Sequence, residues 1–312
     1  MKRALSSVLP SLIPPPADLS GTQVAGNDFS FDILVKGVAD PYDYFGLPVC
    51  PLAEIPIKGS FDSGAGKLDL SLATPHMRQG KDKLIRDTSL KVMVDAFIGM
   101  AKVDASVIFP AKKGDVQLVL DMSGVHDKVI ANVRFNPTFD SVLKGGVSLQ
   151  TLFGKIPDAL DRKERLAVHV DILPSAVTVK ETVWNIANGK IDYSGSNVSV
   201  SNFLIRHGNQ FVKIDGVASE DPSDHLRIAL NDIDLDYIFS ILNINYVTFG
   251  GMATGEVVGS RLLTKTPQAS TRFLRVRNLS YNGAVLGNGD LASTFFPEEM
   301  KVGIYAVIKD PL

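Results

Sequence analysis

The sequence has 312 residues, of which 45% are hydrophobic and 21% are charged, and this balance is typical of a folded protein rather than a disordered one. Its 32 Lys and Arg residues are spread thinly and are nearly balanced by 34 Asp and Glu residues, which argues against nucleic acid as the primary partner. One cysteine, Cys50, rules out an intramolecular disulfide and a thiolate metal site, and no window holds the roughly 18 apolar residues of a membrane-spanning helix.

Apolar and polar residues alternate along nearly the whole chain, which is the pattern of strands with one apolar face. In chain order, the alternation predicts strands at residues 67–72, 90–96, 103–107, 115–121, 128–135, 166–172, 191–193, 198–200, 226–230 and 302–308. Turn signals separate them, among them SGVHDK at 123–128, ANGK at 187–190 and RHGNQ at 206–210, and these indicate hairpins. We therefore predict an all-β fold, built as a long antiparallel meander.

Three further features refine this prediction. An apolar residue stands two positions before a glycine in IKGS at Ile57 and in IDGV at Ile214, and we expect such glycines to permit a turn or bulge where the sheet coils. The segment Asp234–Ile244 is the clearest helical pattern, and it predicts a short helix that acts as a plug or cap. Pro174 is the best internal boundary, dividing one continuous body into 1–174 and 175–312.

The motifs that could carry chemistry are incomplete. The five histidines are too far apart for a zinc pair on one helix, and LGNGDLA at 286–292 is followed by Pro297, so we interpret it as a hairpin turn rather than a dinucleotide site. Asp232, Asp234 and Asp236 have the spacing of a calcium loop, but its glycine and its final glutamate are missing. We therefore predict no catalytic residue, no metal, no cofactor and no enzymatic activity.

A sheet with one continuous apolar face must cover that face, close on itself or leave a groove for an apolar ligand. Few predicted helices are available to form a second layer, which favours a curled sheet with a groove. The alternation assigns the following residues to the groove lining: Leu68, Leu70, Leu72, Leu90, Val92, Val94, Val103, Val107, Val116, Leu118, Leu120, Val129, Ala131, Val133, Leu166, Val168, Val170, Trp184, Ile186, Ile191, Tyr193, Val198, Val200, Leu226, Ile228, Leu230, Val302 and Ile304.

Three segments carry a resemblance to a known family. TVWNIANGKIDYSGSNVSVSNFLIRHGNQFVKIDGVAS (182–219), LRIALNDIDLDYIFSILNINYVTFGGMATGEVVGSRLL (226–263) and LSYNGAVLGNGDLAST (279–294) resemble segments of the TamB family, the translocation and assembly module subunits of the AsmA-like superfamily, in the form found in Bacteroidetes. The resemblance is strong over about 177–312 and looser before. Its motifs belong to the fold rather than to a catalytic site.

The resemblance implies an elongated, twisted, taco-like sheet with an apolar groove in the periplasm. It also implies phospholipid acyl chains as ligand, an outer-membrane barrel partner of the TamA/BamA type, and a role in lipid transport or outer-membrane protein assembly. The family's inner-membrane anchor and barrel-docking segment are not recognisable here, so we expect a fragment of a longer protein. The alternative is a structural β-protein, an adhesin stalk or a carbohydrate-binding module, whose apolar face is sealed as an ordinary core.

Overall fold

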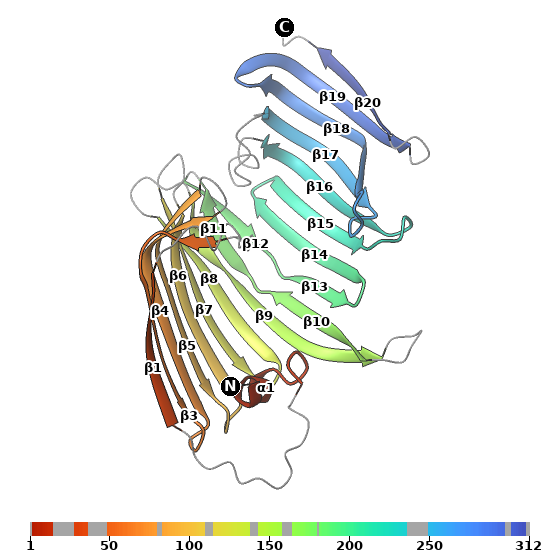
Figure 1. Cartoon of the computed structure of the whole chain (residues 1–312). Coiled ribbons are helices and arrows are strands. Elements are labelled where there is room, and N and C mark those ends of the chain that lie inside the picture. The colour runs from red at the N-terminus through yellow and green to blue at the C-terminus, as the bar shows by residue number, and fades with distance from the viewer. Residues whose placement is uncertain are drawn as a thin grey trace. The chain divides into compact units, whose positions relative to one another are not determined.

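The computed structural model describes residues 2–14, 28–36, 49–79, 83–109, 115–137, 143–157, 164–179, 181–235, 249–296 and 301–309. Apart from the short helix α1 (Lys2–Val8), every helix or strand of this part of the chain that the structure delimits is a β-strand (Figure 1). Each pairing whose register is defined is antiparallel. The prediction of an all-β, antiparallel fold is therefore confirmed, whereas α1 is a helix that the sequence did not predict.

The chain forms two compact units, which are described separately. Unit 1 comprises Met1–Val170 and Ser175–Glu181, and unit 2 comprises Asp171–Pro174 and Thr182–Leu312. The division falls close to Pro174, but β11 (Ser175–Val179) belongs to unit 1 because it pairs with the start of β9 (Leu143–Pro157).

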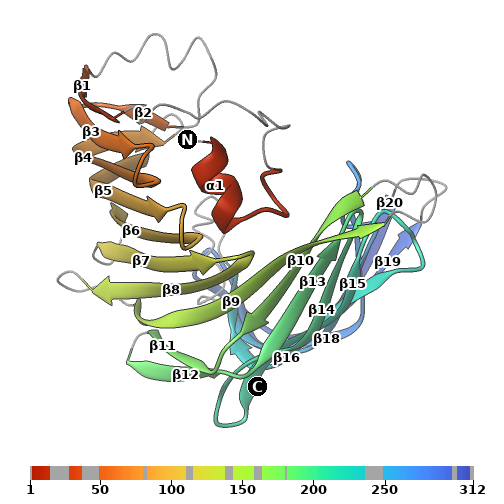
Figure 2. The same cartoon turned by 90° about the horizontal axis from the view of Figure 1, so that it is seen from below.

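Unit 1 is a meander of long strands. Its remaining strands are β1 (Asp28–Val35), β2 (Val49–Pro51), β3 (Ile55–Asp62), β4 (Lys67–Gln79), β5 (Lys83–Asp95), β6 (Met100–Phe109), β7 (Val116–Val125), β8 (Lys128–Pro137) and most of β10 (Glu164–Ile172), whose last two residues belong to unit 2. From β3 to β9 each strand pairs with the next one along the chain, β1 lies beside β3, and β2 pairs with the far end of β4. Figure 2 shows α1 lying against one side of this sheet.

Unit 2 has the same organisation. Its strands are β12 (Thr182–Ile186), β13 (Gly189–Ser194), β14 (Asn197–His207), β15 (Gln210–Ala218), β16 (His225–Asp234), β17 (Phe249–Ser260), β18 (Gln268–Tyr281), β19 (Ala284–Phe296) and β20 (Lys301–Lys309). From β14 to β20 each strand pairs with its successor.

The predicted turn at ANGK (187–190) is wrong. β12 and β13 do not form a hairpin; both pair with β14, so they are two halves of one interrupted strand. The amide of Ala187 donates a hydrogen bond to the carbonyl of Leu204 (2.9 Å), which keeps the interruption beside β14. The sequence signal and the structure differ because Gly and Asn also suit a break within a strand.

Glycines follow apolar residues for two different reasons. Gly216 has a φ of +123°, and a Cβ there would overlap the carbonyl oxygen of His225 on the neighbouring strand, so this position requires glycine for backbone conformation. Gly59 has ordinary backbone geometry, but a Cβ there would overlap the Phe31 ring, so its glycine makes room for an aromatic side chain of β1.

The predicted helix Asp234–Ile244 lies almost wholly outside the described residues and stays a prediction.

Candidate functional site

The register of unit 1 aligns apolar residues in a continuous row across seven strands. Residues directly opposite one another in antiparallel strands point to the same face, and the pairing runs Ile57, Leu72, Leu90, Ala105, Leu120, Val133, Val147 from β3 to β9. A second row on the same face runs Leu70, Val92, Val103, Met122, Ala131, Leu149 from β4 to β9. We call the side that carries these rows the apolar face of unit 1.

The opposite side of the same strands is polar. The residues next to the first apolar row pair as Asp32, Lys58, Ser71, Lys91, Asp104, Asp121, Asn132, Ser148 from β1 to β9. Three of these residues make ion pairs: Lys58 pairs with Asp32 at 3.1 Å, and Asp121 pairs with Arg134 at 2.6 Å. The sheet of unit 1 is therefore amphipathic from β3 to β9.

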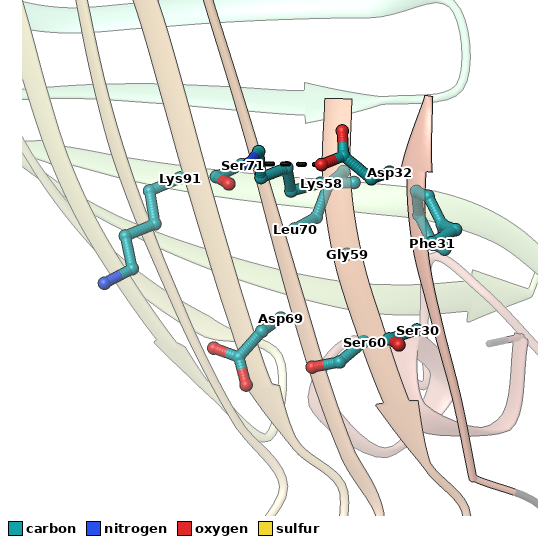
Figure 3. A pocket seen from close by; sticks show the side chains of 10 residues that line it. All are labelled: Ser30, Phe31, Asp32, Lys58, Gly59, Ser60, Asp69, Leu70, Ser71 and Lys91. Atoms are coloured by element: carbon teal, nitrogen blue, oxygen red, sulfur yellow. Dashed lines mark ion pairs between the residues drawn. The ribbon is translucent and has the colours of Figure 1, made fainter. Parts of the chain in front are cut away.

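The polar side also carries a shallow hollow over β1, β3, β4 and β5 (Figure 3). Ser30, Ser60, Asp69 and Lys91 contribute side chains to it, and Asp32 and Lys58 form their ion pair there. Most of its lining residues stand on the polar side of these strands, and Phe31, Gly59 and Leu70, which belong to the other side in the register, complete it. The hollow is therefore mainly a feature of the polar side.

The helix α1 covers one end of the apolar face. Val8, which is only 2% exposed, forms a cluster with Leu68 and Val94, and Leu5 and Leu9 pack around it. Val94 is 3% exposed, so it lies in a sealed core rather than on an open wall. Leu68 and Val94 were both assigned to the groove lining, but α1 packs on them; alternation within a strand carries no information on what covers its residues.

A turn of the sheet fixes the chain that follows α1. Asp127, between β7 and β8, donates its amide hydrogen to the carbonyl of Val8 (2.8 Å), and its carboxylate accepts hydrogen bonds from the amide and the hydroxyl of Ser11 (2.9 and 2.8 Å). Gly99 lies close to the helix, since a Cβ there would be 2.8 Å from the carbonyl oxygen of Ser7. The position of α1 is therefore set by directional contacts as well as by apolar packing.

The middle of the apolar face has no such cover in the part of unit 1 that the structure describes. Leu72, Leu90, Leu120 and Val133 all keep part of their surface exposed to solvent. Within the described ranges of unit 1, α1 is the one element outside the sheet, and it packs at the Leu68 and Val94 end. Among the described residues, an apolar wall several strands wide thus keeps part of its surface exposed.

Unit 2 repeats this arrangement. One apolar row runs from β14 to β20 and consists of Ile205, Val212, Leu230, Gly255, Leu274, Leu291 and Ala306. A second row lies parallel to it and contains three predicted residues, in the order Ile191, Val200, Gly216, Leu226. Ala253 and Val276 are almost fully buried, so part of this face is a closed core.

A bulge keeps the apolar side of β14 continuous. Asn202 has a φ of +57°, and the register shifts there so that Val200 and Phe203, an odd number of positions apart, both pair with the apolar side of β15. The carboxylate of Asp215 accepts a hydrogen bond from the amide of Asn202 (2.6 Å). Lys213 hydrogen-bonds to the same carboxylate and, with the Asn202 amide, lowers the pKa of Asp215 below its ordinary value.

The other predicted lining residues divide into several groups. Val107, Val116, Leu118 and Val129 lie on the apolar face of unit 1, with Val129 buried at the α1 end. Leu166, Val168 and Val170 of β10, and Val198 and Ile228 of unit 2, are half-buried, whereas Tyr193 is more exposed and donates its hydroxyl hydrogen to the carbonyl of Gly195 (2.9 Å). Trp184 and Ile186 are each only 5% exposed, so they belong to closed packing. The side chains of Val302 and Ile304 lie outside those described.

Sequence reasoning missed several members of these rows. Val147 and Leu149 alternate with Ser148 and Gln150 in β9, and Val212 and Ile214 alternate with Lys213 and Asp215 in β15, so the signal was present. Phe203 was not recognisable, because the bulge at Asn202 breaks the strict period of two on which the assignment relied.

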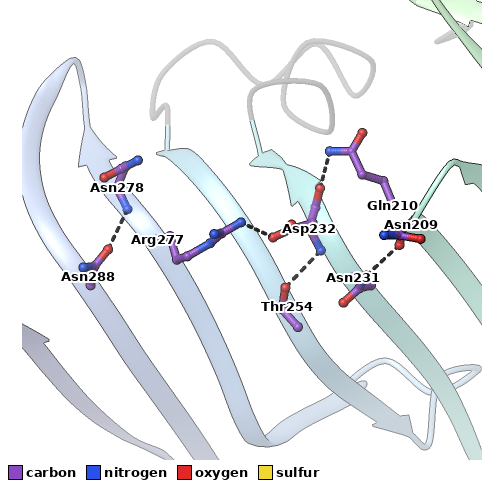
Figure 4. Close-up of polar contacts among 8 residues, drawn as sticks. All are labelled: Asn209, Gln210, Asn231, Asp232, Thr254, Arg277, Asn278 and Asn288. Atoms are coloured by element: carbon purple, nitrogen blue, oxygen red, sulfur yellow. Dashed lines mark hydrogen bonds and ion pairs between the residues drawn. The ribbon is translucent and has the colours of Figure 1, made fainter.

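Two of the three aspartates with calcium-loop spacing, Asp232 and Asp234, lie at or next to a bulge of β16. The Asp232 carboxylate pairs with Arg277 (2.5 Å), and its amide donates to the hydroxyl of Thr254 (2.9 Å), as Figure 4 shows. Gln210 donates to the Asp232 carbonyl (2.6 Å). Asp236 lies outside the described residues, and nowhere in the described ranges do three His, Cys, Asp or Glu side chains gather as metal ligands would.

The predicted turn at LGNGDLA is wrong, since these residues lie inside β19 and the turn precedes them at Asn282 and Gly283. Gly287 and Gly289 stand opposite Leu279 and Val276, and a Cβ at Gly289 would come within 3.1 Å of the Leu279 side chain. The glycines therefore leave room for a buried apolar pair.

Comparison with known proteins adds no further identification: no family model matches the chain, and no curated protein or solved structure is significantly similar to it. Among the helices of the described residues, none has the length and apolar character needed to cross a bilayer.

Proposed function

We propose that this chain is a TamB-like, AsmA-like periplasmic protein that holds phospholipid acyl chains against the apolar faces of its sheet. The observation that carries the proposal is the partly exposed row from Ile57 to Val147, which is backed by a polar face, while α1 covers only the Leu68 and Val94 end of the same strands. An acyl chain lying there would replace water over aliphatic side chains, and burying about 12 methylenes contributes on the order of 10 kcal/mol.

The dimensions of the row suit such a ligand. Six steps between neighbouring strands, at about 4.8 Å each, give about 29 Å from β3 to β9. One leaflet supplies half of the roughly 30 Å hydrocarbon core of a bilayer, so the row is about twice as long as one acyl chain and leaves room for the chain to move along it. Because the row offers aliphatic contacts and no polar partner, neighbouring positions are similar in energy, which favours sliding of the chain along the face. From the resemblance to the TamB family we further propose a role in lipid transport between membranes or in outer-membrane protein assembly, with a barrel partner of the TamA/BamA type.

The test is retention of lipid by two matched variants. Leu90→Asp places a carboxylate in the exposed part of the row, where it costs several kcal/mol against a bound acyl chain. Lys91→Asp places the same group on the polar side of the same strand. We expect native mass spectrometry to detect co-purified phospholipid on the wild type and on Lys91→Asp, and to find it lost from Leu90→Asp while the circular dichroism spectrum remains that of a β-protein.

Two outcomes would contradict the proposal. Wild-type protein free of phospholipid after gentle purification would remove its basis. Unfolding of Leu90→Asp, with Lys91→Asp intact, would instead favour the sealed-core alternative, an adhesin stalk or carbohydrate-binding module. The burial of Trp184 already disfavours a sugar-binding platform built on that residue, because such a platform presents an exposed aromatic face.

A further inference from the structure

The surface beneath α1 is a continuation of the apolar face of unit 1. Leu68, Leu70 and Leu72 alternate along β4, so all three side chains lie on the same side of the sheet. The register defines a further row on that side, which consists of Phe61, Leu68, Val94, Ala101, Gly124 and Val129. We call this row the α1 seat. It offers a ligand the same kind of aliphatic surface as the partly exposed rows beside it.

The middle of the α1 seat makes room for the helix. Ala101 and Gly124 are the two smallest residues of the row. In the neighbouring row, the same two strands carry Val103 and Met122. A Cβ on Gly124 would be 3.3 Å from Cγ1 of Val8, which is itself only 2% exposed. The Val8 side chain therefore fills the space that the small residues leave.

α1 depends on the sheet for its stability. It has seven residues, which is too short for a helix to be stable in water by itself. Its first turn has no acidic residue and its last turn has no basic residue, so no such charge favours the helix dipole. Leu5, Val8 and Leu9 supply its apolar contacts with the seat. An apolar ligand that makes the same contacts is therefore a direct competitor of the helix.

We propose that the α1 seat is a second site for a phospholipid acyl chain, which α1 keeps closed until the acyl chain displaces it. The side chains of α1 and an acyl chain bury the same aliphatic surface, so the two exclude each other from the seat. The helix thus lowers the apparent affinity of the seat to the extent that the closed form is populated. The inference rests on the proposed function, because it adds a second, regulated place for the same ligand.

The test is photo-crosslinking from inside the seat. Phe61 packs at the edge of the cluster around Val8, and benzoylphenylalanine at this position replaces one aromatic side chain by another. The purified full chain is irradiated with phosphatidylcholine vesicles, and phospholipid adducts are counted by mass spectrometry. A zwitterionic lipid is used because the carboxylates of Asp62, Asp95 and Asp127 lie at the turns of this end.

Two matched variants change one residue of the same segment. Val8→Ser removes the side chain that fills the seat, and we expect it to raise the yield of phospholipid adducts from position 61 about tenfold. Leu12→Ser is the control, because Leu12 is 43% exposed, and its yield should equal that of the wild type. Ser11→Ala keeps the seat intact and removes only the hydroxyl bond to Asp127, so it should raise the yield by a smaller factor.

Hydrogen exchange tests the competition in the opposite direction. If lipid and α1 exclude each other, the coupling is reciprocal, so vesicles should make amide exchange in residues 2–14 of the wild type faster. Slower exchange on adding vesicles would mean that lipid packs beside α1 and does not replace it, which would overturn the inference.

The remaining outcomes separate the inference from the proposed function. Equal yields at position 61 in the wild type, Val8→Ser and Ser11→Ala, with phospholipid still retained by the wild type in native mass spectrometry, would make α1 a permanent part of the core and overturn the inference alone. If Val8→Ser does not fold, Ser11→Ala decides in its place. Wild-type protein that retains no phospholipid at all would contradict the proposed function and this inference together.

Discussion

At the scale of single residues, glycines inside strands are where this fold is least tolerant of change. Gly216 has a φ of +123° and lies against the carbonyl of His225, so any side chain there is strained and must also push the neighbouring strand away. We expect Gly216→Ala to lower the free energy of unfolding by about 3 kcal/mol or more. Urea unfolding followed by circular dichroism measures this.

Gly154 supplies the control for that measurement. It also lies within a long strand, β9, but a Cβ there would have no neighbour within 4 Å and its φ is not positive. Gly154→Ala should change the free energy of unfolding by less than about 0.5 kcal/mol. Equal effects at the two positions would show that the cost of side chains in these strands does not come from the conformation of Gly216.

At the scale of elements, α1 is held on the apolar face by one carboxylate and a small core. Asp127→Gly tolerates the positive φ of this position and keeps the hydrogen bond from its amide to the Val8 carbonyl, but it removes the two hydrogen bonds that the amide and the hydroxyl of Ser11 donate to the carboxylate. We expect amide hydrogen exchange in residues 2–14 to become roughly tenfold faster, because hydrogen bonds to a charged group contribute about 1.5–3 kcal/mol. Peptides from β17 and β18 should be unchanged.

Ser11→Ala tests the same contact from the other side. It should change exchange in the same direction, and the double variant should be little worse than Asp127→Gly alone, because the two residues share one interaction. An increase of exchange spread evenly over unit 1 would instead mean that Asp127 stabilises the β7–β8 turn and not the helix.

The strands could be predicted from the sequence, whereas the helix α1 and the bulges could not. Strict alternation, as in Leu68, Leu70 and Leu72, predicted the strands and their apolar side, because a period of two is a local property. The helix α1 and its burial of Val94 were not predicted, since they depend on contacts between residues far apart in the chain. The bulges at Asn202 and Asp232 were not predicted for a related reason: they are stabilised by residues on neighbouring strands, Asp215 and Thr254.

At the scale of the whole molecule, one design recurs in both units: a long antiparallel meander with apolar residues on one face and polar residues on the other. A single sheet of this kind is stable in water only where something covers its apolar face. In the described residues that cover is partial, with α1 at one end of unit 1 and a closed core around Ala253 and Val276 in unit 2. The remaining apolar surface is the basis of the proposed lipid-holding function.

The most direct test of that claim is photo-crosslinking from two adjacent residues of β7. Leu120 lies in the exposed apolar row and Val119 lies on the polar side, opposite Ser106 and Arg134, so a photoreactive amino acid at each position samples one face from the same strand. The crosslinking is carried out in cells, and the adducts are identified by mass spectrometry. We predict phospholipid adducts from position 120 and none above background from position 119. Phospholipid at both positions alike, or only protein adducts from position 120, would contradict the account.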